Sequence, residues 1–200
     1  PYKEFIMASE VDIANSALNM IGASNINSLT EDSVAARIMN QRYEFVRDAV
    51  FRSHPWNCLV RRASLARNTT APTWGYEYAY NLPTDPFSLR VLRLEKLDID
   101  YKVEGRTIVS DEETMKIKYI ARITDPNEYD TLLMETISAR LAADTCYSIT
   151  NSNSLVASMY SLYEAKLKEA RFVDATEGMP GVEGADLGVV QADTFINSRY

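Results

Sequence analysis

The chain is poor in the residues on which metal sites and thiol chemistry depend. Its 200 residues include a single histidine, His54, and two cysteines, Cys58 and Cys146. Zinc sites draw on histidines and cysteines at short spacings, so the sequence predicts no such metal site. Two cysteines so far apart form no disulfide framework, and we expect both to be small buried apolar residues. A nucleophilic pair of His54 and Cys58 would lack an orienting residue.

The sequence also lacks a phosphate-binding loop, a dinucleotide fingerprint and a nucleophile elbow, so it predicts no cofactor and no enzyme of those classes. No apolar run approaches the roughly 20 residues that span a membrane. Residues 1–6 lack the basic start and apolar core of a secretory signal. We therefore expect a protein with no membrane partner that is made and kept in a reducing cytoplasm.

Positive charge is in deficit, because 28 acidic residues exceed 21 basic ones and the net charge is −7. The chain therefore lacks the overall positive charge that is typical of nucleic-acid-binding proteins, although this does not exclude a local basic patch. The candidates for a basic face on the expected sheet are Arg61, Arg62, Arg67, Arg90 and Arg93. Neighbouring residues on a strand point to opposite faces, so the first two are not expected to act together and sequence-specific DNA binding is disfavoured.

Paired carboxylates are the remaining route to catalysis, as in a glycosidase that places two acids across a sugar bond. The acidic run at residues 111–113 lies at an expected turn, where acids are usually solvated. Glu135 and Asp144 lie on one expected helix and face nearly opposite directions at ~100° per residue. A tail-associated cell-wall (peptidoglycan) hydrolase stays open only as the alternative to a non-enzymatic protein.

Hydrophobic periodicity divides the chain into two helices, a block of strands, two more helices and a tail. This order predicts an α+β fold, in which a bundle of N- and C-terminal helices carries an inserted antiparallel β-sheet or small barrel and an extended C-terminal arm. The expected boundaries are residues 1–57 for the first helices, 58–124 for the β domain, 125–176 for the last helices and 177–200 for the arm.

Capping residues predict where the helices start. Ser9 and Asp12 match a capping box, the second helix is expected directly after Thr30, and residues 125–128 are expected to start the third. The core-facing stripe of the second helix is expected to be Val34, Ala35, Ile38, Met39, Phe45, Val46, Ala49 and Val50. Arg42 falls inside this stripe, either as a snorkelling side chain or as a buried or interfacial arginine paired with a carboxylate.

The stretch FRSHPWNCLV, residues 51–60, joins the second helix to the strands. The residue before a proline disfavours helical dihedrals, so the helix is expected to end at His54-Pro55. Trp56 is expected to anchor the turn in the core, and Asn57 to satisfy backbone groups that the helix end leaves free. His54 is expected to lie near the last carbonyls of the helix, so these four residues define a structural junction.

The β domain is expected to contain about five strands. The sequence YKVEGRTIV predicts a tight hairpin around Glu104-Gly105, and tyrosines alternate with other residues at positions 76, 78 and 80. In the third helix, Leu133, Ile137 and Leu141 are expected to face the core.

The composition and the hydrophobic pattern of the chain change after Glu177. Four of the seven glycines fall between Gly178 and Gly188, and hydrophobic periodicity is lost. A flexible segment with an apolar tip often folds onto a partner. The residues expected to bind one are Phe195, Ile196, Arg199 and Tyr200.

Several segments, in this order and at these spacings, resemble one family of phage structural proteins. They are VDIANSALNMIGA, RYEFVRDAVFRSHPWNCLVRRASLA, YAYNLPTDPFSLRVL, YKVEGRTIVSDEE, YEAKLKEARFVDATEG and DTFINSRY. Together they resemble the tail tubular protein A, or head-to-tail adaptor (connector), family of short-tailed bacteriophages and prophages. The resemblance covers nearly the whole chain, from about Glu10 to Arg199. Its most specific part is Pro-Trp-Asn at residues 55–57 after the helix, followed by the strand segments LPTD at 82–85 and YKVEGR at 101–106.

The resemblance implies a structural virion protein without catalytic residues. Family members form a dodecameric ring beneath the portal protein, join it to the nozzle (tail tubular protein B), and in some phages help to seat tail fibres. Genomic DNA passes through the lumen without sequence-specific binding, and the C-terminal segment engages the portal. The protein would then be made in the cytoplasm of a bacterial host and act in the neck or tail of the virion. Arg42 and the tyrosine row at 76, 78 and 80 are expected to remain available to neighbouring subunits.

Truncation after Glu177 tests the role of the tail. The shortened chain should stay folded, because all expected helices and strands precede the cut, but it should no longer bind the portal. Electron microscopy of the chain mixed with portal measures binding, and circular dichroism is the folding control. A truncated chain that binds the portal as well as the full-length chain would show that the arm is not the docking element.

Overall fold

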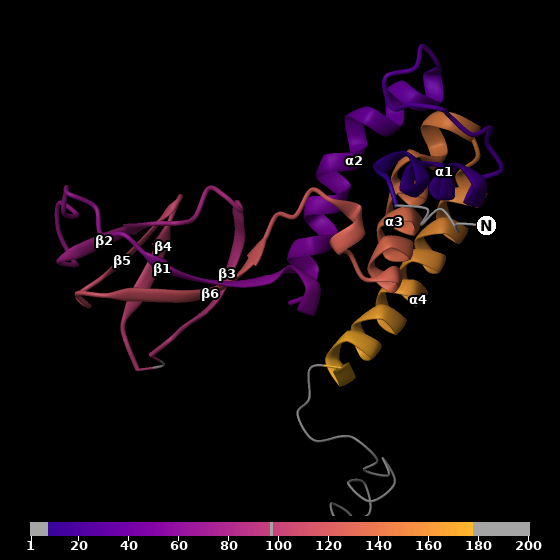
Figure 1. Cartoon of the computed structure of the whole chain (residues 1–200). Coiled ribbons are helices and arrows are strands. Elements are labelled where there is room, and N and C mark those ends of the chain that lie inside the picture. Colours follow the sequence, from indigo (N-terminus) through magenta and orange to yellow (C-terminus); the bar gives the residue numbers. More distant parts are fainter. Residues whose placement is uncertain (1–7, 97, 178–200) are drawn as a thin grey trace, which may run out of the picture.

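The computed structural model describes residues 8–96 and 98–177, which form an α+β fold of four helices and two small antiparallel sheets. The α+β class predicted from the sequence is thereby confirmed. The helices are α1 (Glu10–Met20), α2 (Val34–Ser53), α3 (Thr131–Thr150) and α4 (Asn153–Glu177). Figure 1 shows them gathered at one side of an elongated molecule, with the strands extending from the other side. None of the helices in these ranges is long and apolar enough to cross a membrane.

The β domain consists of two three-stranded sheets instead of one sheet or barrel. Its strands are β1 (Val60–Leu65), β2 (Tyr78–Asn81), β3 (Ser88–Leu94), β4 (Tyr101–Glu104), β5 (Thr107–Ser110) and β6 (Met115–Ala121). The first sheet has the order β1-β6-β3 and the second β2-β5-β4. The central strands β6 and β5 each pair on both edges, and no ladder within the described residues joins the sheets into a closed barrel. The predicted β4–β5 hairpin is confirmed, with Gly105 at φ 59° in its turn.

Helix α1 begins as the sequence predicts. The side chain of Ser9 accepts a hydrogen bond from the Asp12 backbone N–H (3.2 Å), and the Asp12 carboxylate accepts one from the Ser9 N–H (2.9 Å). This reciprocal pair satisfies two of the N–H groups that a helix start leaves free. Gly22 follows the helix with φ 72°, a conformation that glycine adopts without steric cost.

Helix α2 starts later than predicted and buries a different face. Ser33, and not Thr30, caps it by accepting from the Ala36 N–H (3.1 Å). Val34 and Phe45, both predicted to face the core, are exposed, and Phe45 is 70% exposed. The face that is buried contains Ala36, Met39, Tyr43, Val46, Arg47, Val50 and Phe51. The predicted stripe was rotated because it left out Tyr43 and Arg47, whose long side chains carry apolar atoms into the core.

Helix α3 lies at the centre of the helical part, where α1, α2 and α4 all pack against it. Leu133, Ile137 and Leu141 are completely buried, which confirms the predicted inner stripe. The helix begins at Thr131, capped by the Asp130 carboxylate, and not at the predicted Asp125. Residues 126–128 instead form a single 3₁₀ turn that Asp125 caps through the Asn127 N–H (2.9 Å).

Tyr43 is buried in this core without a hydrogen-bond partner for its hydroxyl among the described residues. Burial is the main cause that raises the pKa of Tyr43 above its ordinary value. The ring therefore contributes packing, while the hydroxyl opposes folding.

Replacing Tyr43 by phenylalanine should raise the free energy of unfolding at pH 7 by about 1 kcal/mol, because it removes the unpartnered hydroxyl and keeps the ring. The gain should grow above about pH 10. There the unfolded tyrosine loses its proton while the folded one, with its raised pKa, retains it, so the wild type loses stability as pH rises. Urea denaturation at pH 7 and at alkaline pH measures both effects, with Tyr147→Phe on the exposed side of α3 as the control. Identical stability of Tyr43→Phe and wild type at both pH values would contradict the prediction.

Candidate functional site

The helix-to-sheet junction is a packed cluster between α2, the first strand and α4. As predicted, α2 ends at Ser53 and His54 takes extended dihedrals (φ −149°, ψ 150°) before Pro55. Trp56 is buried as predicted, and its Nε1 donates to the Val50 carbonyl (3.0 Å). Trp56 thus satisfies a carbonyl that the helix end leaves free, which is the task predicted for Asn57.

Asp174 of α4 holds the other side of the junction. Its Oδ1 accepts from the Asn57 N–H (2.9 Å), and its Oδ2 lies 3.0 Å from Nε2 of His54. The side chain of Asn57 also donates to the Asp174 carbonyl (2.6 Å). His54 lies at the end of α2 as predicted, and its ring in addition faces Asp174 of α4. The prediction for Asn57 was wrong about its partners, because this residue contacts α4 instead of the end of α2. Asp174 lies 117 residues after Asn57, so no local pattern announces the contact.

The rare residues of the junction take part in packing and hydrogen bonds within the chain. The His54 ring packs edge-on against Trp56, with 4.8 Å between ring centroids. Burial raises the pKa of the Cys58 thiol, which disfavours the reactive thiolate. Cys146 is buried as predicted, whereas Cys58 is only partly buried.

Replacing Asp174 by alanine should lower the free energy of unfolding by about 2–4 kcal/mol, because the substitution leaves the Asn57 N–H and the His54 ring without their partner. Asp174→Asn should recover part of the loss, since its amide oxygen can still accept from Asn57. Chemical denaturation measures the difference, and Glu177→Ala on the exposed end of the same helix is the matched control. A loss no larger than that of the control would mean that the junction does not depend on this carboxylate.

Three of the acids considered for a hydrolase pair with basic side chains of the chain. Glu135 pairs with Lys166 and Asp144 with Arg42, while Glu112 pairs with Lys96. No group of three or more histidine, cysteine, aspartate or glutamate residues in the described ranges is placed to hold a metal ion. The observed carboxylates thus act as partners of basic side chains.

The arginines of α2 recur every five residues, at positions 37, 42, 47 and 52, so successive ones are turned by ~140° and have different surroundings. Arg37 pairs with Asp32, and Arg52 donates to the Leu89 carbonyl of β3. Arg42 pairs with Asp144 of α3, with Nε 2.6 Å from Oδ2, which confirms the predicted carboxylate partner. Its side chain is 46% exposed, so the pair lies at the surface.

Arg47 is the buried arginine that sequence reasoning missed. Its side chain is 2% exposed and donates to the adjacent Asp48 carboxylate (3.1 Å), with Glu10 of α1 at 3.7 Å. The only signal was its position one turn after Tyr43 on the same side of the helix, and the Arg47 guanidinium lies 5.8 Å from that ring.

The Arg42–Asp144 pair lies within an exposed surface of aromatic and arginine side chains on three helices. The Arg42 guanidinium is 5.8 Å from the Phe45 ring, and that of Arg140 is 5.3 Å from the Tyr160 ring. Hydrogen bonding to Asp144 raises the pKa of Arg42. The contact between Arg140 and Tyr160 brings α4 to the same surface. We call this surface the helical patch; it comprises Arg42, Phe45, Arg140, Asp144, Tyr147 and Tyr160.

The predicted tyrosine row is not a free surface. Tyr80 is buried and its hydroxyl donates to the Glu112 carbonyl, so the expectation for this residue was wrong. Tyr78 is covered by Arg67, whose guanidinium lies 4.1 Å from the ring. Tyr76 is partly buried and donates to Asp100 (3.2 Å). All three tyrosines thus make contacts within the β domain, and Tyr76 and Tyr78 stay partly exposed.

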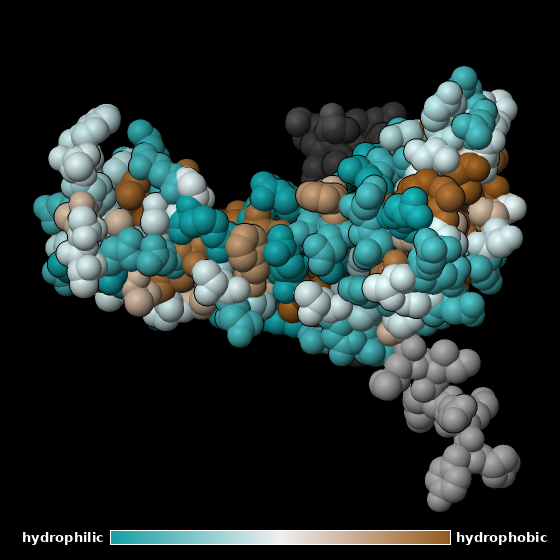
Figure 2. All heavy atoms as spheres, turned by 90° about the horizontal axis from the view of Figure 1, so that it is seen from above, coloured by the Kyte–Doolittle hydropathy of each residue, from teal (hydrophilic) through white to brown (hydrophobic). Residues whose placement is uncertain are grey.

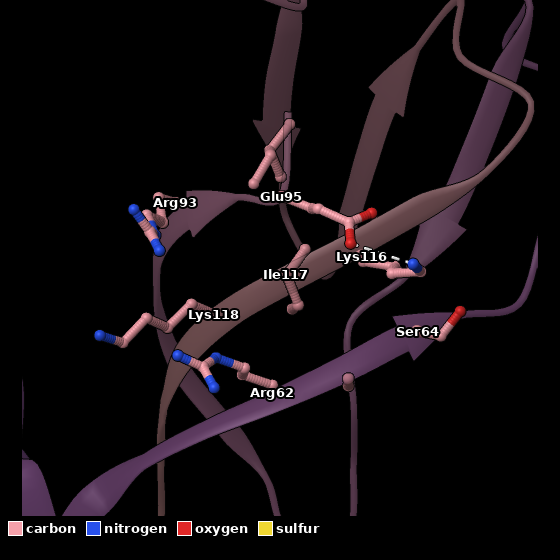
Figure 3. A pocket seen from close by; sticks show the side chains of 9 residues that line it. Arg62, Ser64, Arg93, Glu95, Lys116, Ile117 and Lys118 are labelled. Carbon is pink, nitrogen blue, oxygen red and sulfur yellow. Dashed lines mark hydrogen bonds and ion pairs between the residues drawn. The ribbon is translucent and has the colours of Figure 1, made fainter. Parts of the chain in front are cut away.

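Of the five arginines considered as candidates for a basic face, two line the same pocket. Arg62 of β1 and Arg93 of β3 line a pocket of about 450 Å³ on the first sheet, and Lys118 of β6 lies between them (Figure 3). Sequence reasoning missed Lys118 because it considered arginines alone. The others are used elsewhere: Arg61 pairs with Glu128, Arg67 covers Tyr78 and Arg90 donates to the Arg52 carbonyl.

The predicted partner-binding residues of the tail, Phe195, Ile196, Arg199 and Tyr200, lie outside the described residues. A scan against protein-family models and a search of curated proteins each returned no match to this chain.

Proposed function

We propose that the chain is a head-to-tail adaptor of a short-tailed bacteriophage virion, a structural protein without catalytic activity that assembles into a ring. The order of its sequence segments suggests the family, and the helical patch is the observation that best supports assembly. Arginine, tyrosine and phenylalanine are enriched at the centres of protein interfaces. On the patch, Phe45 is 70%, Tyr147 54% and Tyr160 38% exposed in the single chain.

Helix α4 supports the same proposal. Along its described length only Ala170 and Asp174 are fully buried, while Leu162 and Val173 are partly exposed and Phe172 is 65% exposed. Viewed from above, hydrophobic atoms gather at the helical end of the molecule, while the middle is mostly hydrophilic (Figure 2). Apolar side chains that are exposed on one side of a molecule often mark a site of association.

A closed ring requires two different faces on each subunit, because head-to-tail contacts join unlike surfaces. In the proposed arrangement the four helices form the bundle of a dodecameric ring, and the helical patch contacts the neighbouring subunit. The two sheets project toward the nozzle and, where present, the tail fibres. The arm of residues 177–200 engages the portal, and DNA passes through the lumen. No observation favours the peptidoglycan hydrolase over this function.

Charging the helical patch tests the assignment. Wild-type protein mixed with its cognate portal protein should form rings that electron microscopy resolves. The double variant Phe45→Glu and Tyr160→Glu should stay folded but bind about 1,000-fold more weakly, because each charge would be buried in an aromatic contact at a cost of about 2 kcal/mol.

The matched control is the double variant Trp74→Glu and Tyr101→Glu, which charges two exposed aromatic residues of the β domain instead. It should assemble on the portal like the wild type. Rings that form equally well from the patch variant would refute the role of the patch. A wild-type chain that forms no complex with the portal, or that releases sugars from peptidoglycan, would refute the adaptor function.

A further inference from the structure

Three basic side chains lie next to one another on one face of the β1-β6-β3 sheet. Arg62 is directly opposite Lys118 in the β1–β6 ladder, and Arg93 is directly opposite Lys118 in the β3–β6 ladder. Figure 3 shows the charged ends of these residues on one side of the Lys116–Glu95 ion pair. We call Arg62, Arg93 and Lys118 the basic triad.

A β-bulge aligns the third member of the triad. The β3–β6 pairing shifts by one residue between Val91 and Arg93. Without the shift, Leu92 would oppose Lys118, and Arg93 would oppose Ile117, which is buried. The bulge places Arg93 beside Lys118 at the surface and Leu94 beside Ile117 in the core, and re-aiming a side chain is a common use of bulges.

The charge of the triad is not compensated by the described part of the chain. None of the three side chains has an ion pair, a hydrogen bond or an aromatic partner within residues 8–96 and 98–177. Other cations of the same domain are paired: Lys116 with Glu95 (3.0 Å), and Arg61 with Glu128 (2.9 Å). Like charges directly opposite in a sheet are destabilising, so an anion bound between them would relieve the repulsion.

The chemistry of the pocket favours phosphate over an acidic protein. Besides the triad it is lined by Ser64, Glu95 and Lys116, while Leu94 and Ile117 lie beneath as buried core residues. None of the large hydrophobic residues exposed in the described ranges lines it. A protein partner would find no apolar centre of the kind that interfaces use, whereas a phosphate backbone requires only cations and hydroxyl donors.

We propose that the basic triad, with Ser64, binds the phosphodiester backbone of a nucleic acid without reading its sequence. Three adjacent strands spread the cations over about 10 Å, a length over which duplex DNA carries on the order of six phosphate charges. Arginine forks suit phosphate oxygens, and no aromatic side chain lines the pocket to stack on a base. The site belongs to the β domain and does not rest on the adaptor function, so it holds equally for a chain that never assembles into a ring.

The test is fluorescence anisotropy of the full-length chain with labelled duplexes of two unrelated sequences across a series of NaCl concentrations. Both duplexes should bind with the same affinity. The net charge of −7 makes binding weak, so it should be measured from low salt upward. Three phosphate contacts predict a slope of about −3 when the logarithm of the binding constant is plotted against that of the salt concentration.

The triple variant R62Q/R93Q/K118Q should bind at least about tenfold more weakly at the lowest salt and lose nearly all of the salt slope. The control R37Q/K102Q/K168Q removes the same number of positive charges from exposed positions outside the pocket and should keep the slope. The melting temperature of the triad variant should equal or exceed that of the wild type, because repulsion between the cations is removed.

Four results would overturn the proposal. The first is a wild type that fails to bind duplex at the lowest salt, and the second is a triad variant that binds as well as the wild type. The third is a control variant that loses as much affinity as the triad variant, which would assign binding to the net charge of the chain. The fourth is competition by poly-glutamate that is as effective, per charge, as competition by unlabelled duplex. This result would assign the triad to an acidic protein surface instead.

Discussion

The carboxylate of Asp174 fixes the direction in which the chain leaves the helices. It binds the Asn57 N–H (2.9 Å) and lies 3.0 Å from the His54 ring, so it holds the residues on both sides of Pro55. The proline prevents α2 from continuing but does not by itself choose the path of the chain that follows. Because the strands are entered through this junction, this acidic side chain helps to set the position of the first sheet relative to α4.

Asp48 provides the second connection, where the chain returns from the strands. Its carboxylate pairs with Arg122 directly after β6 (2.6 Å) and with Arg47 in the core of the helices (3.1 Å). Arg122 also lies 4.4 Å from the Phe87 ring, which Arg106 from the β4–β5 turn contacts at 3.9 Å. One acid of α2 is thus connected through two arginines and one ring to both sheets. Asp48 is mostly buried, where such pairs are screened less than at the surface.

Most features that depend on neighbours in sequence could be predicted, except the starts of α2 and α3, where a second capping residue a few positions later was used. Features that depend on distant neighbours could not be predicted. The local ones are the Ser9 cap, the end of α2 before Pro55, the hairpin at Gly105 and the inner stripe of α3. The buried face of α2 was misjudged because Tyr43 and Arg47 are amphipathic, and their surroundings decide which way they face. The partners of Asp174 and the alignment of Arg93 with Lys118 arise from helix packing and from a bulge, for which the alternation of residues gives no signal.

The two surfaces proposed for binding differ in how their positive charge is balanced. In the helical patch, Arg42 is paired with Asp144, so it can be covered by another protein without leaving a bare charge, and Arg140 lies beside the rings of Tyr160 and Tyr163. The basic triad has no such compensation within the described residues, in a chain where acids outnumber bases. Its charged ends add nothing to the core beneath them, so packing does not require the arrangement. A polyanion supplies the missing charge and can do so in water, where a dry protein contact would demand further desolvation. Because one surface lies on the helices and the other on the first sheet, the same chain can contact a protein and a polyanion at once.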